Sequence, residues 1–175
     1  MPTAHTASSI VAVTQATPAL AGRDAALERA CELIVDAGQT GASLIIFPAA
    51  FIPGYPDWVW SITSGEVALR DALTTAIRTH TVRIPSDVTD RLCRVARRAC
   101  IAVVIGLVEC AEAAGGTTIY NTLLSIDARG EIRGCYRAAV SAGASQLIWT
   151  PAAANVANEG QRAPLTPEIS SIGGI

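Results

Sequence analysis

The sequence contains no lysine, because all thirteen basic residues of its 175 are arginine. Charged residues make up only 16% and the net charge is −2, so nothing in the charge balance attracts nucleic acid or an anionic membrane. No apolar run reaches the ~18 residues of a membrane span. The N-terminus lacks the basic and apolar regions of a secretory signal. We therefore expect a cytoplasmic protein with no nucleic-acid and no membrane partner.

Histidine is scarce as well, since His5 and His80 are the two present and stand far apart. The five cysteines are Cys31, Cys93, Cys100, Cys110 and Cys135. None has C-x-x-C spacing, and a zinc site requires clustered Cys and His, so we expect no metal. Cys31 and Cys100 border apolar runs, which predicts buried, reduced thiols.

Motifs of several enzyme classes are missing. There is no G-x-S-x-G element, no phosphate-binding loop and no dinucleotide glycine pattern. Two pairs of carboxylates occur at helical or turn spacing, Asp87 with Asp90 and Glu109 with Glu112. Both are interpreted as solvated pairs rather than an acid/base dyad.

What the chain has in abundance is apolar residues, at 50%. This excludes a disordered chain. It also exceeds what a small lone domain hides easily, so we expect a homo-oligomer or a partner chain.

The apolar pattern alternates between strand and helix. Strands are predicted at 10–13, 43–47, 101–108, 119–126 and 131–140, and helices at 24–37, 64–79 and 86–99, with Ser64 and Ser86 as N-caps. A turn is predicted at 111–118 and a hairpin turn at 127–130. From Ser141 onward the pattern fades. The order of elements indicates an α/β sheet.

The last predicted helix carries four arginines about one turn apart, Arg91, Arg94, Arg97 and Arg98. A solvated helix face is the favoured interpretation, and an anion site is the alternative.

One segment is more specific. Residues 44–60, Leu-Ile-Ile-Phe-Pro-Ala-Ala-Phe-Ile-Pro-Gly-Tyr-Pro-Asp-Trp-Val-Trp, closely resemble the first catalytic segment of the nitrilases, within the carbon–nitrogen hydrolase superfamily. Further segments match in the same order: 103–109 resembles the central strand, 120–130 the hairpin, 136–149 the second catalytic segment, and 166–175 the approach to the third.

The resemblance implies an α/β fold, a partial αββα (four-layer) nitrilase-like sandwich. We expect residues 1–175 to form a single domain, truncated at its C-terminal side. The family hydrolyses a nitrile or amide carbon–nitrogen bond without any cofactor, and its members pair through helix faces. A Cys attacks the carbon through a thioester, a Glu transfers protons, a Lys stabilises the charged intermediate, and a second Glu supports the site.

The family's catalytic positions carry other residues here. Its Glu falls on Ala49, its Lys on Ala138 and its second Glu on Ser145, and its Cys is expected just beyond Ile175. No shifted alignment restores the Lys, because the chain has none. The resemblance also implies that Tyr55 and Trp58 line the substrate pocket.

Three functional hypotheses remain. The first is an inactive nitrilase-family chain. The second is a non-catalytic interaction or assembly subunit that pairs with an intact nitrilase. The third, least favoured, is a new activity that uses Cys135 or Glu109.

Overall fold

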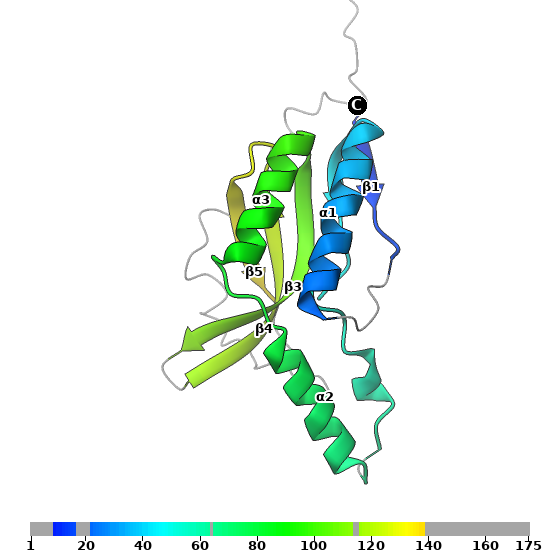
Figure 1. Cartoon of the computed structure of the whole chain (residues 1–175), viewed down its shortest axis with the longest axis vertical. Coiled ribbons are helices and arrows are strands. Elements are labelled where there is room, and N and C mark those ends of the chain that lie inside the picture. The colour runs from blue at the N-terminus through cyan, green and yellow to red at the C-terminus, as the bar shows by residue number, and fades with distance from the viewer. Residues whose placement is uncertain (1–8, 17–21, 64, 114–115, 139–175) are drawn as a thin grey trace, which may run out of the picture.

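A computed structural model describes residues 9–16, 22–63, 65–113 and 116–138 (Figure 1). These residues form one five-stranded sheet in the order β1-β2-β3-β4-β5, together with three α-helices and a short 3-10 helix. The strands are β1 (Ile10–Val13), β2 (Ala42–Ile46), β3 (Ala102–Ala113), β4 (Gly116–Ile126) and β5 (Ile132–Arg137). The helices are α1 (Arg23–Gln39), η1 (Asp57–Trp60), α2 (Val67–Thr79) and α3 (Asp87–Ala99).

The sheet has a parallel half and an antiparallel half. Strands β1, β2 and β3 are parallel, so each connection between them must cross over the sheet, and α1 and α3 lie in these crossovers. Strands β3, β4 and β5 are antiparallel and need only hairpins. This α/β arrangement confirms the predicted fold class.

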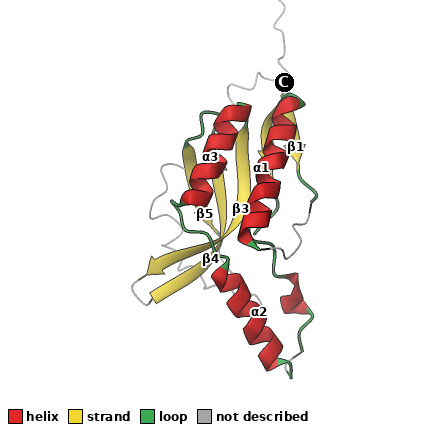
Figure 2. Cartoon of the chain, viewed as in Figure 1, coloured by secondary structure: helices red, strands yellow, loops and turns green. Residues whose placement is uncertain are grey.

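Helices α1 and α3 lie side by side over one face of the sheet (Figure 2). Alternate residues of β3, namely Val103, Ile105 and Leu107, face these helices and are completely buried with Ile34 of α1 and Leu92 of α3. Because side chains alternate along a strand, the intervening residues of β3 point to the opposite face.

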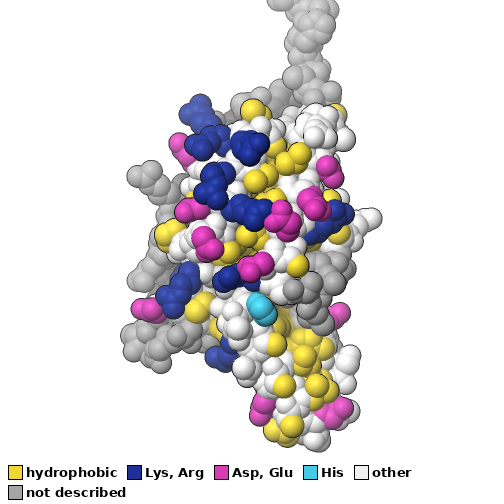
Figure 3. All heavy atoms as spheres, viewed as in Figure 1, with side chains coloured by type: hydrophobic (Ala, Val, Ile, Leu, Met, Phe, Trp, Pro, Cys, Tyr) yellow, Lys and Arg dark blue, Asp and Glu magenta, His cyan; other side chains and the backbone are white. Residues whose placement is uncertain are grey.

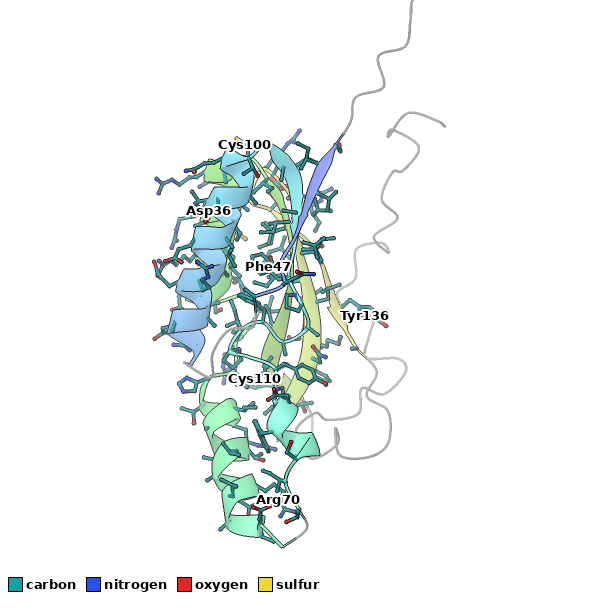
Figure 4. All side chains as sticks on the ribbon, turned by 90° about the vertical axis from the view of Figure 1, so that its right-hand side faces the viewer. Asp36, Phe47, Arg70, Cys100, Cys110 and Tyr136 are labelled. Carbon is teal, nitrogen blue, oxygen red and sulfur yellow. The ribbon has the colours of Figure 1, made fainter. Side chains whose placement is uncertain are left out.

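We call that opposite face the open face, because several of its apolar side chains are exposed in the part of the chain that the structure describes. On it, Val13 is 69% exposed, Tyr136 is 49% exposed and Leu123 is 36% exposed. Figure 4 shows Tyr136 on the side of the sheet away from α1. Such a row of apolar side chains is typical of a sheet face that packs against further structure.

The turn between β4 and β5 confirms the predicted hairpin at 127–130. The Asp127 carboxylate accepts hydrogen bonds from the backbone N–H groups of Arg129 and Glu131, at 2.9 and 3.0 Å. Gly130 has φ of +76° and packs so closely on α3 that an added Cβ would lie 2.3 Å from the Cys93 carbonyl oxygen.

Two predictions about local structure are wrong. The turn expected at 111–118 is mostly strand, because β3 runs to Ala113 and pairs directly with Gly116 of β4. The Ala and Gly residues there have low β-propensity, but cross-strand pairing overrides it. Cys100 is exposed instead of buried, because it ends α3 in the left-handed conformation with φ of 54°.

Other predictions concern helix ends and undescribed residues. Helix α3 begins after Ser86, as predicted. Helix α2 begins at Val67 after Glu66, and its predicted cap, Ser64, lies outside the described residues, as does everything from 139 to 175. Within the described part of the chain, none of the helices combines the length and apolar character needed to cross a membrane.

Candidate functional site

The first candidate position, Ala49, lies in a turn that interrupts the pairing of β2 with β3. The N–H of Phe47 still donates to the Val104 carbonyl at 2.8 Å. Pairing resumes at Ile52, whose carbonyl accepts from the N–H of Val108 at 2.8 Å. The chain between these points bulges away from the ladder as a turn, in which Ala50 has φ of 50°.

Gly106 of β3 is what allows this turn to lie close to the sheet. A Cβ added at Gly106 would lie 2.4 Å from the Pro48 carbonyl oxygen and 2.6 Å from the Ala49 Cα. Both are backbone atoms, so they have little freedom to move aside. Gly106 alternates with the helix-facing residues of β3, so the turn places Ala49 on the open face, where it is exposed.

The turn is held from both sides. Phe47 and Phe51 are buried in the core and meet edge to face, with ring centroids 4.8 Å apart. Ala50 packs in a second small cluster with Val108, Ile77 of α2 and the half-buried Trp58. The backbone at Ala49 is therefore fixed, although its side chain is only a methyl group.

The second candidate position follows a buried ion pair at the end of β5. Arg137 donates to both carboxylate oxygens of Glu109, from Nε at 2.9 Å and from Nη2 at 2.6 Å. The hydroxyl of Thr122 donates to the same carboxylate at 2.6 Å. The Arg137 guanidinium also lies over the Tyr120 ring, 4.6 Å from its centroid. Three strands are thus joined through one carboxylate.

This ion pair corrects the interpretation of Glu109 as one of two solvated carboxylates. The side chain of Glu109 is 2% exposed, and its hydrogen bonds raise the pKa of Arg137. Glu112 does match the expectation, since its side chain is 78% exposed in a surface pair with Arg83. Nothing in the sequence indicated the strand register, which pairs Arg137 of β5 with Thr122 of β4 and pairs β4 with β3 at Glu109. The turn predicted at 111–118 left out part of this pairing.

Ala138 comes directly after Arg137. Its N–H donates to the Asn121 carbonyl at 2.8 Å, which continues the pairing with β4. Because Arg137 points to the helix side, alternation places Ala138 on the open face. Ala49, over β3, and Ala138, at the end of β5, thus lie on the same face on either side of β4. Ser145, the third position, lies outside the described residues.

The two predicted pocket residues occupy different environments. Tyr55 is 39% exposed, beyond the Ala49 turn. Trp58 is half-buried and lines a pocket against α2 to which neither Ala49 nor Tyr55 contributes. That these side chains contact a substrate stays a prediction.

Three of the five cysteines, Cys31, Cys93 and Cys135, do not have the environment of a nucleophile. Burial, together with the Glu109 carboxylate, raises the pKa of Cys135 to about 11. Burial also raises the pKa of Cys31 and of Cys93. A nucleophilic thiol requires a lowered pKa. Nor does the described part of the chain contain a group of three or more His, Cys, Asp or Glu residues placed to hold a metal ion.

The arginines of α3 gather on the surface of the helical layer (Figure 3). Arg91 pairs with Glu28 of α1, while Arg94, Arg97 and Arg98 are exposed along the same helix. This is the arrangement expected of a solvated face.

Sequence comparisons link the chain to known proteins. Residues 10–140 match the model of the family described as Carbon-nitrogen hydrolase. A nitrilase from Bacillus sp. is 32% identical over 139 residues, which are 79% of this chain and 39% of that protein. An arylacetonitrilase from Hypocrea virens is 39% identical over 124 residues, which are 70% of this chain and 35% of that protein. The chain spans about two fifths of the length of the curated relatives it matches.

Solved structures share the fold. An amidase from Nesterenkonia sp. matches with a TM-score of 0.54 and 20% identity, over 82% of this chain and 48% of that one. A carbon-nitrogen hydrolase from Helicobacter pylori matches with a TM-score of 0.54 and 16% identity, over 82% of this chain and 44% of that one. The described α and β layers correspond to part of the four-layer sandwich that the sequence resemblance implies.

Proposed function

The chain belongs to the carbon–nitrogen hydrolase family, and from that membership we propose that it is a nitrilase-type chain that keeps the scaffold but does not hydrolyse nitriles. The observation that carries the proposal is the Ala49 turn. Its backbone is fixed over Gly106 on the open face, and its side chain is a methyl group where the resemblance places the family's proton-transferring Glu.

The second family position supports the same conclusion. The resemblance places the family's Lys at Ala138, and the sequence contains no Lys that could take its place. Arg137 is not a substitute, because it is engaged with Glu109 on the other side of the sheet. A positioned acid or base contributes about 10²–10⁴-fold to a rate. Losing one member of a cooperating set removes most of what the set provides, so losing two leaves no route through this mechanism.

Family membership also bears on ligands and location. The substrates of the family are small nitriles or amides, and no cofactor is needed. Tyr55, exposed beyond the Ala49 turn, is the side chain we propose to line the substrate site. Trp58 is less suited to that role, because it faces a pocket to which Ala49 does not contribute. The five free thiols are consistent with a reducing compartment, and we propose a cytoplasmic location.

The direct test is ammonia release. The 175-residue chain is incubated with phenylacetonitrile and, separately, with phenylacetamide, and ammonia is measured against a protein-free blank. The expected result is no release above the blank with either compound. Phenylacetonitrile is chosen because relatives are named arylacetonitrilases.

A control guards against a contaminating hydrolase. Tyr55→Ala is purified in parallel, because a contaminant would be unaffected by this change. Ammonia release by the wild-type chain that disappears in Tyr55→Ala would overturn the proposal.

A second candidate function is an assembly subunit that pairs with an intact nitrilase. The exposed apolar side chains of the open face favour it, because Val13 and Tyr136 have no cover among the described residues. Sedimentation of the chain alone and mixed with a nitrilase tests this. Co-sedimentation in fixed proportion is the expected result, and a chain that stays strictly monomeric in both samples contradicts it.

A further inference from the structure

The open face of the sheet carries rows of uncharged side chains that cross the strands. Residues that pair across neighbouring strands point to the same face, so the strand register defines each row. The central row crosses all five strands and consists of Val13, Ile46, Val104, Ser125 and Gly134. It is flanked on one side by Val11, Leu44 and Ala102, and on the other by Leu123 and Tyr136. The rows thus take two residues from each strand, and none of these residues is charged.

Covering these rows costs little in polar groups. The one side-chain hydroxyl in the central row, that of Ser125, already donates to the Gly134 carbonyl oxygen at 3.3 Å. Exposed apolar surface extends to both edge strands, at Val13 of β1 and Tyr136 of β5. A partner that packs here therefore removes apolar surface from water without stripping a charge of its hydration.

The helix layer on the other side of the sheet has the opposite character. Arg94, Arg97 and Arg98 are exposed along α3, and Figure 3 shows the arginines gathered on this layer. Figure 4 shows α1 on one side of the sheet and Tyr136 on the other. In a two-fold contact between identical chains, the same patch meets itself. Through α3 such a contact would bring arginines toward their own copies, whereas through the open face it brings no charges together.

The shape of the open face also suits a second copy. Two sheets with the same right-handed twist pack face to face at a separation of ~10 Å, with their strands about 30° apart. Two copies of one sheet necessarily share the same twist. The absence of charge from the rows and the twist of the sheet therefore both favour self-association through this face.

We propose that two copies of this chain dock open face to open face, so that the two sheets meet in the middle and α1 and α3 of each copy lie outside. This inference does not rest on the proposed function. Because the contact takes two residues from each strand, it lies at the small end of specific interfaces, which is roughly 1,000 Å² in total. We therefore expect a Kd of roughly 10–100 µM, with a monomer and an uncovered open face at ~1 µM.

Sedimentation equilibrium of the 175-residue chain, over concentrations that span the expected Kd, tests the proposal. The mass is expected to rise from that of one chain, 18.1 kDa, to twice that value and no further. A mass that stays at 18.1 kDa up to ~300 µM overturns the proposal, because the open face is then left bare or is covered within the same chain. A mass that climbs past two chains also overturns it, because a two-fold contact closes on itself.

A matched pair of arginine substitutions locates the contact. Val13 and Val35 are both exposed valines, the first on the open face and the second on α1. Val13→Arg buries a charge in the contact and is expected to weaken dimerisation at least ~10-fold. Val35→Arg adds the same charge to the helix layer and is expected to dimerise like the wild type. Tyr136→Arg repeats the open-face test from the other edge strand if circular dichroism shows that Val13→Arg does not fold.

The comparison of the two surfaces decides where the dimer forms. Weaker dimerisation of the open-face variant, with Val35→Arg unchanged, is the expected result. A Val35→Arg effect as large as that of the open-face arginine overturns the proposal, because it places the contact on the helix layer. Unchanged dimerisation of a folded open-face variant overturns it as well.

Discussion

The two faces of the sheet differ in how far their side chains are covered in the described structure. On the side of α1 and α3, Leu92 and Ile105 have no exposed surface. On the open face, Val13 and Tyr136 keep about half or more of theirs. Ala49 and Ala138, where the sequence resemblance places the family's Glu and Lys, both lie on the open face. Under the proposed function, the covered face keeps the scaffold and the open face is the one from which the reactive groups are missing.

The same contrast appears in two Glu–Arg pairs that start from one strand. Glu109 and Glu112 are three residues apart on β3. Glu109 is buried, bidentate with Arg137 and bonded to Thr122, whereas Glu112 meets Arg83 in solvent. Two Glu–Arg pairs therefore differ in how much the loss of the glutamate is expected to destabilise the fold, because a buried charge left without its partner is not solvated by water.

Replacing each glutamate by alanine gives the largest expected difference. Glu109→Ala leaves the Arg137 guanidinium largely buried without its carboxylate, and is expected to lower the free energy of unfolding by about 3–5 kcal/mol. Glu112→Ala is expected to cost less than ~1 kcal/mol, because exposed pairs contribute little. Urea unfolding followed by circular dichroism measures both. Equal losses in the two variants would mean that Glu109 does not join the strands as described.

Truncating apolar side chains compares the faces directly. Leu92→Ala removes a fully buried side chain beneath α3 and is expected to cost about 2–4 kcal/mol. Val13→Ala on the open face is expected to cost less than ~1 kcal/mol, since most of that side chain is already exposed in the described structure. A loss for Val13→Ala as large as that for Leu92→Ala would show that the open face is covered in solution.

Glycine substitutions test the close approach of the Ala49 turn. Gly106→Ala forces a methyl group against the backbone of Pro48 and Ala49, and is expected to cost about 1–3 kcal/mol. Gly65→Ala is the matched control, because nothing lies within 4 Å of its added Cβ and its φ is not positive. A neutral Gly106→Ala would place the turn farther from the sheet than the structure does.

A smaller effect is expected in the reactivity of the Cys135 thiol, which lies on β5 in the antiparallel half of the sheet. With its pKa raised to about 11, Cys135 carries about 100-fold less thiolate at pH 8 than it would at the usual value of 9.0. Its raised pKa also means that it stabilises the fold below pH 9, and that this contribution is lost as the pH rises from 9 through 11. Iodoacetamide at pH 8, followed by peptide mapping, is expected to modify the exposed Cys100 well before Cys135. Faster labelling of Cys135 would contradict its burial beside Glu109.

Much of the framework was predictable from the sequence because local patterns and tertiary packing agree there. The β-branched run at β1 and the helical period of α1 both match the elements found. The hairpin at 127–130 was predictable from Asp127 and Gly130, whose roles are local. The resemblance over residues 44–60 located the Ala49 turn, although the sequence did not indicate that Gly106 is what supports it.

The missed features depend on residues distant in sequence. The buried state of Glu109 depends on the register of β3, β4 and β5. The local sequence around Glu109, which has a second carboxylate three residues later, gave no sign of it. The exposure of Cys100 depends on a left-handed helix end at a non-glycine residue, which propensity disfavours. The pocket lined by Trp58 requires α2 and the start of α1 to meet, which no single segment encodes.

The central claim is that this chain has the hydrolase scaffold without the hydrolase chemistry, and a search for the covalent intermediate tests it most directly. The family mechanism passes through a substrate bound to a cysteine sulfur. The 175-residue chain is incubated with phenylacetonitrile, quenched in acid, and all five cysteine-containing peptides are mapped by mass spectrometry. We predict five unmodified cysteines, and a substrate-derived adduct on any one of them would contradict the account.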